Sequence, residues 1–320
     1  MKAFGEEARS DAAEADRKVA AAQALGPLHG VPFTIKENID VAGFPTTWGV
    51  PAFAGAVPPV DAPVVERMRA AGAIAIGRTN LPDMGLRMHT ESSLHGLTRN
   101  PWNPARTASG SSGGDAVALA AGMSALGLGN DIGGSLRNPA SACGVASIRP
   151  SQGRVPHAGF IPREDTLLAV QLMHTRTAQW PGGSAMCALL SVASAGLPPL
   201  DAAAMSRVFA ERYGLARAWS QFMAEYPLVL SPVWTQLPFE VGFDVASPEN
   251  VAATAQMSRP VLPANLFGLP SACVPAGRDA VTGLPIGVLL TGRRMCDAEC
   301  RAAAEGIESR LGLKTPIDPP

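Results

Sequence analysis

Two glycine-rich serine turns and a solitary lysine constrain this chain more than any other feature. The first turn, Ser109–Gly114, reads SGSSGG, and the second, Asp131–Arg137, reads DIGGSLR. Lys36 lies upstream, at the end of the segment VPFTIK. Glycine permits close backbone approach and turn conformations that other residues resist. Each turn can therefore hold a serine hydroxyl beside backbone N–H groups, a geometry suited to chemistry at a carbonyl group.

The candidate chemistry centres on Ser111, Ser135 and Lys36. A serine hydroxyl is a poor nucleophile at neutral pH unless a base removes its proton. A lysine can be that base when burial lowers its pKa, and Ser111 could relay a proton between Ser135 and Lys36. Taken alone, the residues leave a second interpretation equally open, in which Lys36 ends a strand and reaches solvent.

Hydrophobic periodicity predicts helices and strands in alternation. The segment 31–36 alternates between apolar and polar positions, which predicts a strand that presents Thr34 and Lys36 on one face. A helix over 62–71, followed by a short buried strand over 72–77, indicates α/β layering. A helix over 113–121 begins directly at the first serine turn. We also expect helices over 6–24, 202–225 and 298–311, and strands over 146–149, 228–230 and 286–290.

Composition and charge narrow the classes of partner. The 320 residues are 47% hydrophobic, which is enough to bury a large core. The net charge is −1 and no basic block occurs, so nucleic acid is not expected as a partner. The N-terminus is charged and lacks a signal-peptide core, and the apolar stretch 116–129 is too short to span a bilayer. We therefore expect a soluble, cytoplasmic protein without a membrane partner.

The cysteines and histidines predict neither a disulfide framework nor a metal site. The five cysteines are scattered and odd in number. Cys296 and Cys300 could share a helix face, but no histidine lies nearby to complete a zinc site. The five histidines show no metal-binding spacing. We expect no metal and no cofactor.

Several motifs occur in an order that resembles the amidase signature family, serine hydrolases that act on carboxylic amides. The resemblance begins near Pro27, and its most specific part, 100–155, holds both serine turns. GPLHGVPFTIKENIDVAG resembles the family's lysine strand, and NLFGLPSACVPAG with GLPIGVLLTG resembles its closing hairpin region. The resemblance implies a single α/β domain with a central mixed, twisted β-sheet flanked by helices. The domain is expected to span 1–320. Within it we distinguish a core motif region over 27–160, a variable, shortened segment over about 174–199, and a C-terminal part over 200–320.

The same resemblance implies a Ser–cis-Ser–Lys triad. Ser135 is then the nucleophile, and Lys36 is the base. Ser111 follows a cis peptide bond and relays the proton between them. The remaining site residues are those whose backbone N–H groups form an oxyanion hole, Ile132, Gly133, Gly134 and Ser135, and the supporting residues Ser112, Asp131 and Arg137.

The chain departs from the family pattern near both turns. Ala108 and Ser109 stand where the family usually has Pro and Gly, so Ser109 bears on the conformation of the first turn. Asp115 occupies a position where a small residue is common. Asn130 replaces the usual Ser or Thr. None of these changes removes the triad.

The function that the resemblance implies is hydrolysis of a small-molecule amide to an acid and ammonia or an amine, through a serine acyl-enzyme. One alternative is a non-catalytic or partner-dependent relative, including an amidotransferase-subunit-like protein. Another alternative takes Gly110–Gly114 as the G-x-S-x-G elbow of an α/β-hydrolase esterase, with Ser112 as nucleophile. That enzyme needs a downstream histidine, and His157 and His174 lie far from the C-terminal end where it usually falls. The sequence leaves the amide and the oligomeric state open, a homodimer included.

Overall fold

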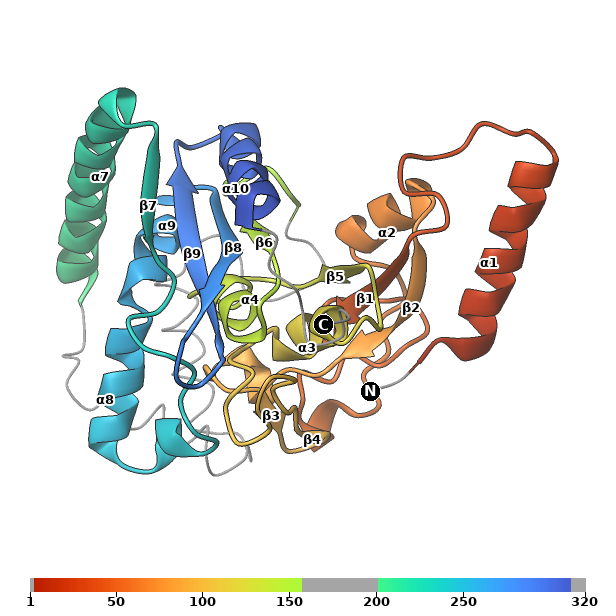
Figure 1. The fold of residues 1–320 in the computed structure, drawn as a ribbon, viewed down its shortest axis with the longest axis horizontal. Coiled ribbons are helices and arrows are strands. Elements are labelled where there is room, and N and C mark those ends of the chain that lie inside the picture. The colour runs from red at the N-terminus through yellow and green to blue at the C-terminus, as the bar shows by residue number, and fades with distance from the viewer. Residues whose placement is uncertain (1–2, 157–200, 312–320) are drawn as a thin grey trace.

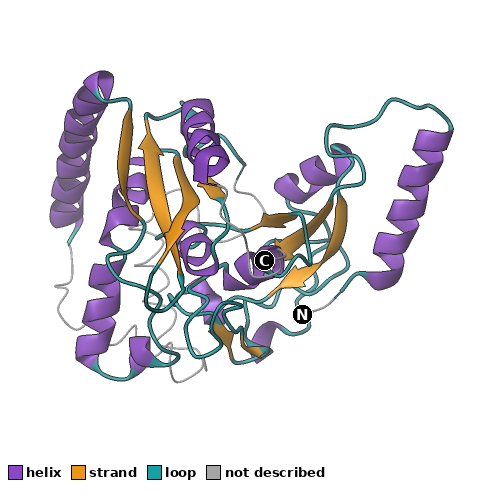
Figure 2. Ribbon diagram, in the orientation of Figure 1, coloured by secondary structure: helices purple, strands orange, loops and turns teal. Residues whose placement is uncertain are grey.

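The computed structural model describes residues 3–156 and 201–311, and Figure 1 shows how their elements are arranged. Two β-sheets occupy the inner part of the molecule, and helices lie around them (Figure 2). One sheet comes from the first half of the chain, and the other comes mainly from the C-terminal part.

The first sheet is parallel and has the order β2–β1–β5. Two helices belong to it, α2 between β1 and β2, and α3 between β2 and β5. Their bounds are β1 Pro32–Lys36, α2 Pro63–Ala70, β2 Ile74–Thr79, α3 Gly113–Ala120 and β5 Leu126–Leu128.

The central strand β1 is buried on both faces, as is usual in a parallel sheet covered by helices. Phe33 and Ile35 pack against Val65 of α2 in one hydrophobic cluster. Thr34 and Lys36 point to the opposite face, toward α3 and the turn before it. The predicted alternation over 31–36 is confirmed, and the polar face of the strand is buried as well.

The second sheet is antiparallel and has the order β6–β8–β9–β7. Strands β8 and β9 form the hairpin that the sequence motifs indicated. The helix α4 packs against this hairpin, and so does α10. Their bounds are α4 Arg137–Cys143, β6 Ser147–Arg149, β7 Leu228–Pro232, β8 Ser271–Arg278, β9 Pro285–Gly292 and α10 Asp297–Leu311.

The two helices cover opposite faces of the hairpin because side chains alternate along a strand. Cys273 and Leu289 belong to the cluster that includes Cys143 of α4. Their neighbours Ala272 and Leu290 pack instead with Ala304 of α10. The second serine turn leads directly into α4, so this packing fixes the turn against the C-terminal sheet.

In Figure 1, helix α1 lies at one end of the molecule and α7 at the other, and β3, β4 and α8 lie along its lower edge. The hairpin β3–β4 and the helices α8 and α9 complete the described elements of regular α and β structure. Their bounds are α1 Gly5–Ala20, β3 Glu91–Ser92, β4 Gly96–Leu97, α7 Ala202–Glu225, α8 Pro248–Met257 and α9 Leu262–Phe267.

The predicted α/β fold class is confirmed. In the described residues, the strands expected in one central mixed sheet are divided between a parallel and an antiparallel sheet. The predicted helix over 6–24 is shorter than expected, because it ends at Ala20 and Ala22 adopts a positive φ of 50°. The segment expected to be shortened, 174–199, lies outside the described residues. Within 3–156 and 201–311, no helix combines the length and apolar character needed to cross a membrane.

Candidate active site

The candidate site lies at the carboxyl edge of the parallel sheet. Strand β1 ends at Lys36, and β5 runs parallel beside it, with Ile35 paired to Leu128. The chain leaves β5 and enters the second serine turn within a few residues. Because α3 runs back from β2 to the start of β5, its N-terminus and the first serine turn lie at the same edge. The topology thus brings together three segments that are far apart in the sequence.

The side chain of Lys36 is fully buried. Its Nζ lies 2.7 Å from Ser111 Oγ and 2.7 Å from Asn130 Oδ1. Asn130 is held in turn by Asn38, whose Oδ1 accepts a hydrogen bond from Asn130 Nδ2 at 3.0 Å. The alternative in which Lys36 reaches solvent is therefore wrong.

Burial lowers the pKa of Lys36 to about 7, because the protein interior solvates an ammonium group poorly. The negative charges of Asp115 and Asp131 act in the opposite direction. A pKa in this range leaves a substantial fraction of neutral amine near pH 7. That fraction is what a general base requires.

The first serine turn has the backbone that the resemblance implied. The Gly110–Ser111 peptide bond is cis, and Ser109 has a positive φ of 62°. Thr90 connects the two ends of the turn, because its Oγ1 donates to Ser109 O at 2.7 Å and accepts from Gly113 N at 3.2 Å. These contacts hold Ser111, which is 3% exposed, against the lysine.

Ser135 lies beside the first turn, but its hydroxyl makes no hydrogen bond to any described residue. The backbone of Ser112 donates to Ser135 O at 3.1 Å, which places the two turns in contact. The structure therefore joins Lys36 to Ser111 and sets Ser135 next to them without closing the relay.

The oxyanion-hole expectation needs one correction, at Gly134. Its N–H donates to Asp131 Oδ1 at 2.7 Å and so holds the loop together. In the described part of the chain, the N–H groups of Ile132, Gly133 and Ser135 have no acceptor. These three, without Gly134, are the donors that remain available to an oxyanion.

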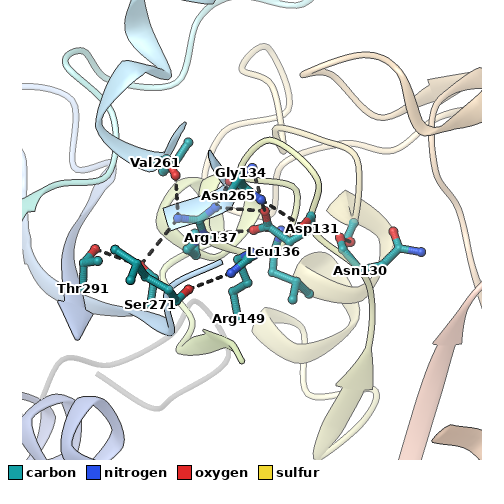
Figure 3. Close-up of polar contacts among 12 residues, drawn as sticks. Asn130, Asp131, Gly134, Leu136, Arg137, Arg149, Val261, Asn265, Ser271 and Thr291 are labelled. Atoms are coloured by element: carbon teal, nitrogen blue, oxygen red, sulfur yellow. Dashed lines mark hydrogen bonds and ion pairs between the residues drawn. The ribbon is translucent and has the colours of Figure 1, made fainter. Parts of the chain in front are cut away.

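Asp131 and Arg137 form a buried ion pair that fixes the second turn (Figure 3). Arg137 Nε and Nη2 donate to the two carboxylate oxygens of Asp131, both at 2.9 Å. Asn265 of α9 donates to Asp131 Oδ1 at 2.9 Å, and Arg137 Nη1 donates to Val261 O at 2.9 Å. The pair thereby ties the turn to α9 and the chain before it.

The protonation of Asp131 follows from this pairing. Burial alone would raise its pKa, but the charge and hydrogen bonds of Arg137 outweigh that effect. The pKa of the Asp131 carboxyl is held well below its usual range. The pair is therefore fully ionised at neutral pH, and its role is to hold the loop.

Ser112 is buried beside Asn130. It is 2% exposed, and its Oγ donates to Asn130 O at 3.3 Å. The three histidines that the structure describes, His29, His89 and His95, make their hydrogen bonds to other groups. No serine–histidine pair is thus assembled at Ser112 among the described residues.

Sequence reasoning missed several polar residues that hold the site. Asn38, Thr90 and Asn265 belong to segments distant from the serine turns, and no spacing rule connects them. Asn130 carried a signal, because it departs from the family pattern, but its contact with Lys36 follows only from the pairing of β1 with β5.

A cavity of about 680 Å³ lies between the edge strands β5 and β6. Its lining is mainly apolar and includes Leu128 and Ile148, with Asn130 at its border. Ser112, Asp115, Asp131 and Leu136 also line it, whereas Ser111 and Ser135 are not among its described lining residues. The cavity therefore adjoins both serine turns and the start of α3.

No three His, Cys, Asp or Glu side chains in residues 3–156 and 201–311 are arranged to hold a metal ion. The four cysteines in these residues, Cys143, Cys273, Cys296 and Cys300, are free thiols.

Comparisons with known proteins show the family and the fold of the chain. The Amidase family model matches residues 1–178 and 199–300. The chain is 34% identical to the indoleacetamide hydrolase of Bradyrhizobium diazoefficiens over an alignment of 417 positions, which includes 97% of this chain and 79% of the hydrolase. It is also 44% identical over 165 residues to the A subunit of the glutamyl-tRNA(Gln) amidotransferase of a Synechococcus, which is 50% of this chain and 34% of that protein. This match covers about a third of the length of that subunit.

Solved structures show the same fold. A crystal structure of an amidase superposes with a TM-score of 0.80 at 24% identity, covering 98% of this chain and 92% of that one. A bacterial aryl acylamidase superposes with a TM-score of 0.76 at 22% identity, covering 100% and 91%. Since the family model matches most of the chain and a relative is 34% identical over nearly all of it, this protein belongs to the amidase signature family.

Proposed function

We propose that this protein hydrolyses carboxylic amides through an acyl-enzyme formed on Ser135. The observation that carries the proposal is the contact between Lys36 and Ser111, with Nζ 2.7 Å from Oγ in a fully buried site. Burial supplies the base, because it lowers the pKa of Lys36 to about 7. The membership of this protein in the family supports the same reaction. So does the relative named a hydrolase, whose alignment includes 97% of this chain.

In the first half-reaction, neutral Lys36 accepts the proton of Ser111, and Ser111 accepts the proton of Ser135. The Ser135 Oγ forms a bond to the carbonyl carbon, and the carbonyl electrons move onto oxygen to give a tetrahedral oxyanion. When the C–N bond breaks, the leaving nitrogen takes a proton back through Ser111 and departs as ammonia or an amine. The acyl group then remains on Ser135.

In the second half-reaction, water attacks the acyl carbon and gives its proton to the same relay. The C–O bond to Ser135 breaks, Ser135 regains its proton, and the acid leaves. The relay needs contact between the hydroxyls of Ser135 and Ser111, which are not hydrogen-bonded without substrate. A rotation of the Ser135 side chain closes it, as hydrogen bonds at active sites often tighten only when substrate is bound.

The oxyanion is stabilised by the N–H groups of Ile132, Gly133 and Ser135, which have no acceptor among the described residues. Such donors accelerate the reaction because they are already oriented when the negative charge develops. The ion pair of Asp131 with Arg137 keeps the loop in this conformation.

We propose a small-molecule amide as the substrate and an arylacetamide as the first to test, since the relative matched over nearly the whole chain is named an indoleacetamide hydrolase. A partner-dependent amidotransferase-like role is the second candidate, because half of the chain is 44% identical to part of such an enzyme. Ammonia release from the isolated protein, without added partner, separates the two. A cytoplasmic location and a homodimer remain predictions.

Two serine substitutions test the assignment of the nucleophile. Ser135→Ala removes the acyl-accepting oxygen, so we expect turnover to fall by at least about 10³-fold and fluorophosphonate labelling to disappear. Ser112→Ala removes one supporting hydrogen bond, worth about 1 kcal/mol, so turnover should fall only several-fold. The measurements are ammonia release and mass-spectrometric mapping of the labelled peptide.

The same pair of variants tests the esterase alternative. A label on Ser112, with an active Ser135→Ala variant, would assign the nucleophile to the elbow. A folded protein that takes no label on either serine would instead favour the non-catalytic relative.

A further inference from the structure

Asp115 carries a buried carboxylate that has no role in the reaction proposed above. It lies in the first turn of α3 and is 4% exposed. Its Oδ1 accepts a hydrogen bond from Thr34 Oγ1 at 2.9 Å. Its Oδ2 is buried and makes no hydrogen bond of ordinary geometry, although the Thr79 hydroxyl of β2 lies close enough to favour the charged carboxyl. A buried carboxylate with so few hydrogen bonds is costly, so its presence calls for a reason.

The sheet is shaped to admit this carboxylate. Thr34 pairs with Gly127 of β5, and a Cβ at Gly127 would lie 3.1 Å from Asp115 Cβ and 3.3 Å from its Oδ1. A larger residue on β5 would therefore press on the carboxyl group. Thr34 precedes Lys36 by two positions, so both side chains leave β1 on the same face. Asp115 is thus held on the face of β1 that carries the lysine.

Of the two carboxylates near Lys36, only Asp115 has no ion-pair partner among the described residues. Two carboxylates act on the lysine, Asp115 from α3 and Asp131 from the loop after β5. Asp131 is already neutralised by a two-point ion pair with Arg137. On the β2 side, Arg78 is directed to the backbone oxygens of Pro45, Glu37 and Ile39. The structure shows no cation within ion-pair distance of Asp115 in the described residues.

We propose that Asp115 is a positioning residue for the base, which stabilises the ammonium that Lys36 becomes when it takes the serine proton. It acts through Lys36 and does not touch the substrate. The inference rests on the proposed function, because it assigns the lysine the role of proton acceptor. The carboxylate acts through its charge and not through a hydrogen bond, since the hydrogen bonds of Lys36 Nζ go to Ser111 and Asn130.

The expected direction follows from the pKa values. Burial raises the pKa of Asp115 to about 6, and burial lowers the pKa of Lys36 to about 7. The negative carboxylate favours the ammonium, so it raises the pKa of Lys36 from where burial alone would put it. Removal of the carboxylate charge must therefore lower the pKa of Lys36 further.

The test measures the lysine directly by NMR titration. The chain has only four lysines, Lys2, Lys18, Lys36 and Lys314, so protein labelled with ¹³C and ¹⁵N in lysine gives few side-chain signals. The signal of Lys36 is identified by its loss in Lys36→Met. In Asp115→Asn the pKa of Lys36 should fall by about one unit or more, and the acid limb of the kcat/KM profile for amide hydrolysis should move to lower pH in parallel.

The matched control is Asp297→Asn, the same change at a buried carboxylate on α10 that accepts hydrogen bonds from Ser151. It should leave both the Lys36 titration and the acid limb in place. If Asp115→Asn does not fold, Asp115→Ser, with the small residue common at this position in the family, should give the same shift.

The Lys36 titration and the hydrolysis assay distinguish a failure of the Asp115 inference from a failure of the proposed function. An unchanged Lys36 titration in folded Asp115→Asn or Asp115→Ser would overturn the inference, whatever the activity. If the wild-type protein hydrolyses no amide but Lys36 still shifts, the proposed function fails, and the electrostatic pairing of Asp115 with Lys36 stands.

Discussion

Ser109 has a backbone conformation that explains why the family usually has glycine at this position. Its φ of 62° lies in the left-handed region, where glycine is favoured. The hydroxyl of Ser109 adds a second cost, because it is buried and unpaired among the described residues. The turn holds its shape because the Ser109 backbone is tied on both sides, by Thr90 and by Thr107 Oγ1, which accepts from Ser109 N at 2.9 Å.

Replacing Ser109 by glycine should therefore stabilise the protein. A left-handed conformation costs an L-residue about 1–2 kcal/mol, which glycine avoids. The greater freedom of glycine in the unfolded chain offsets about 0.5–1 kcal/mol of this stabilisation. With relief of the buried hydroxyl, we expect Ser109→Gly to raise the free energy of unfolding by about 1 kcal/mol. Urea denaturation measures it.

Ser109→Ala is the matched control, because it removes the hydroxyl and keeps the backbone cost. The difference between the glycine and alanine variants gives the cost of φ once the unfolded-state freedom of glycine, about 0.5–1 kcal/mol, is allowed for. An alanine variant more stable than the glycine variant by about 0.5–1 kcal/mol would show that the backbone of Ser109 is not strained.

At the scale of elements, sequence patterns predicted what depends on local periodicity. The strand over 31–36, the helix over 113–121 and the helix over 202–225 all form, with boundaries shifted by at most a residue or so. These segments carry a clear period of two or 3.6, or begin at a glycine turn. The motif β8–β9 was recognised by resemblance, and it does form a hairpin.

What could not be predicted depends on which strands become neighbours. The short strand β5 carries only three residues, too few for a periodic signal. Its pairing with β1 is what brings Asn130 to Lys36, and neither residue type alone indicates that contact. The same holds for Asn265, which reaches Asp131 only because α9 packs over the second turn. Contacts of this kind are set by topology, not by local sequence.

The turn from Asp131 to Arg137 gives an element-scale prediction. Arg137→Met leaves the Asp131 carboxylate buried without its cation, so we expect the free energy of unfolding to fall by about 3–5 kcal/mol. Because the folded pKa of Asp131 lies below its unfolded value of about 3.9, the ion pair stabilises above about pH 4 and its contribution is lost as the pH falls further. The deficit of the variant should shrink in acid. Denaturation at pH 7 and below pH 4 measures both effects.

A second substitution checks that the loss comes from the unpaired charge. Asp131→Asn combined with Arg137→Met removes both charges, and the double variant should be less destabilised than the sum of the single changes. Strict additivity would mean that the two side chains act independently and would contradict the ion-pair account.

On the scale of the whole molecule, the proposed site is held by both sheets. The parallel sheet supplies the proposed base, Lys36, from β1, and α4 anchors the second turn against the antiparallel sheet. This arrangement costs stability, because it buries an ammonium group, a carboxylate without a cation and a strained turn at one edge. Proteins commonly accept such costs where function requires them.

The clearest test of that cost is Lys36→Met, which keeps the side-chain volume and removes the charge. A lysine whose pKa is lower in the folded state destabilises the protein by its full amount below the folded pKa of about 7, and by nothing above the unfolded pKa of about 10.4. We therefore expect Lys36→Met to lose amide hydrolysis and yet to be more stable than the wild type in urea at pH 6–7, with the advantage vanishing as the pH approaches 10. Lys18→Met, at an exposed lysine of α1, should change neither property. A variant less stable than the wild type at pH 7 would mean that the hydrogen bonds of Lys36 to Ser111 and Asn130 outweigh its burial, and that the site holds the molecule together instead of straining it.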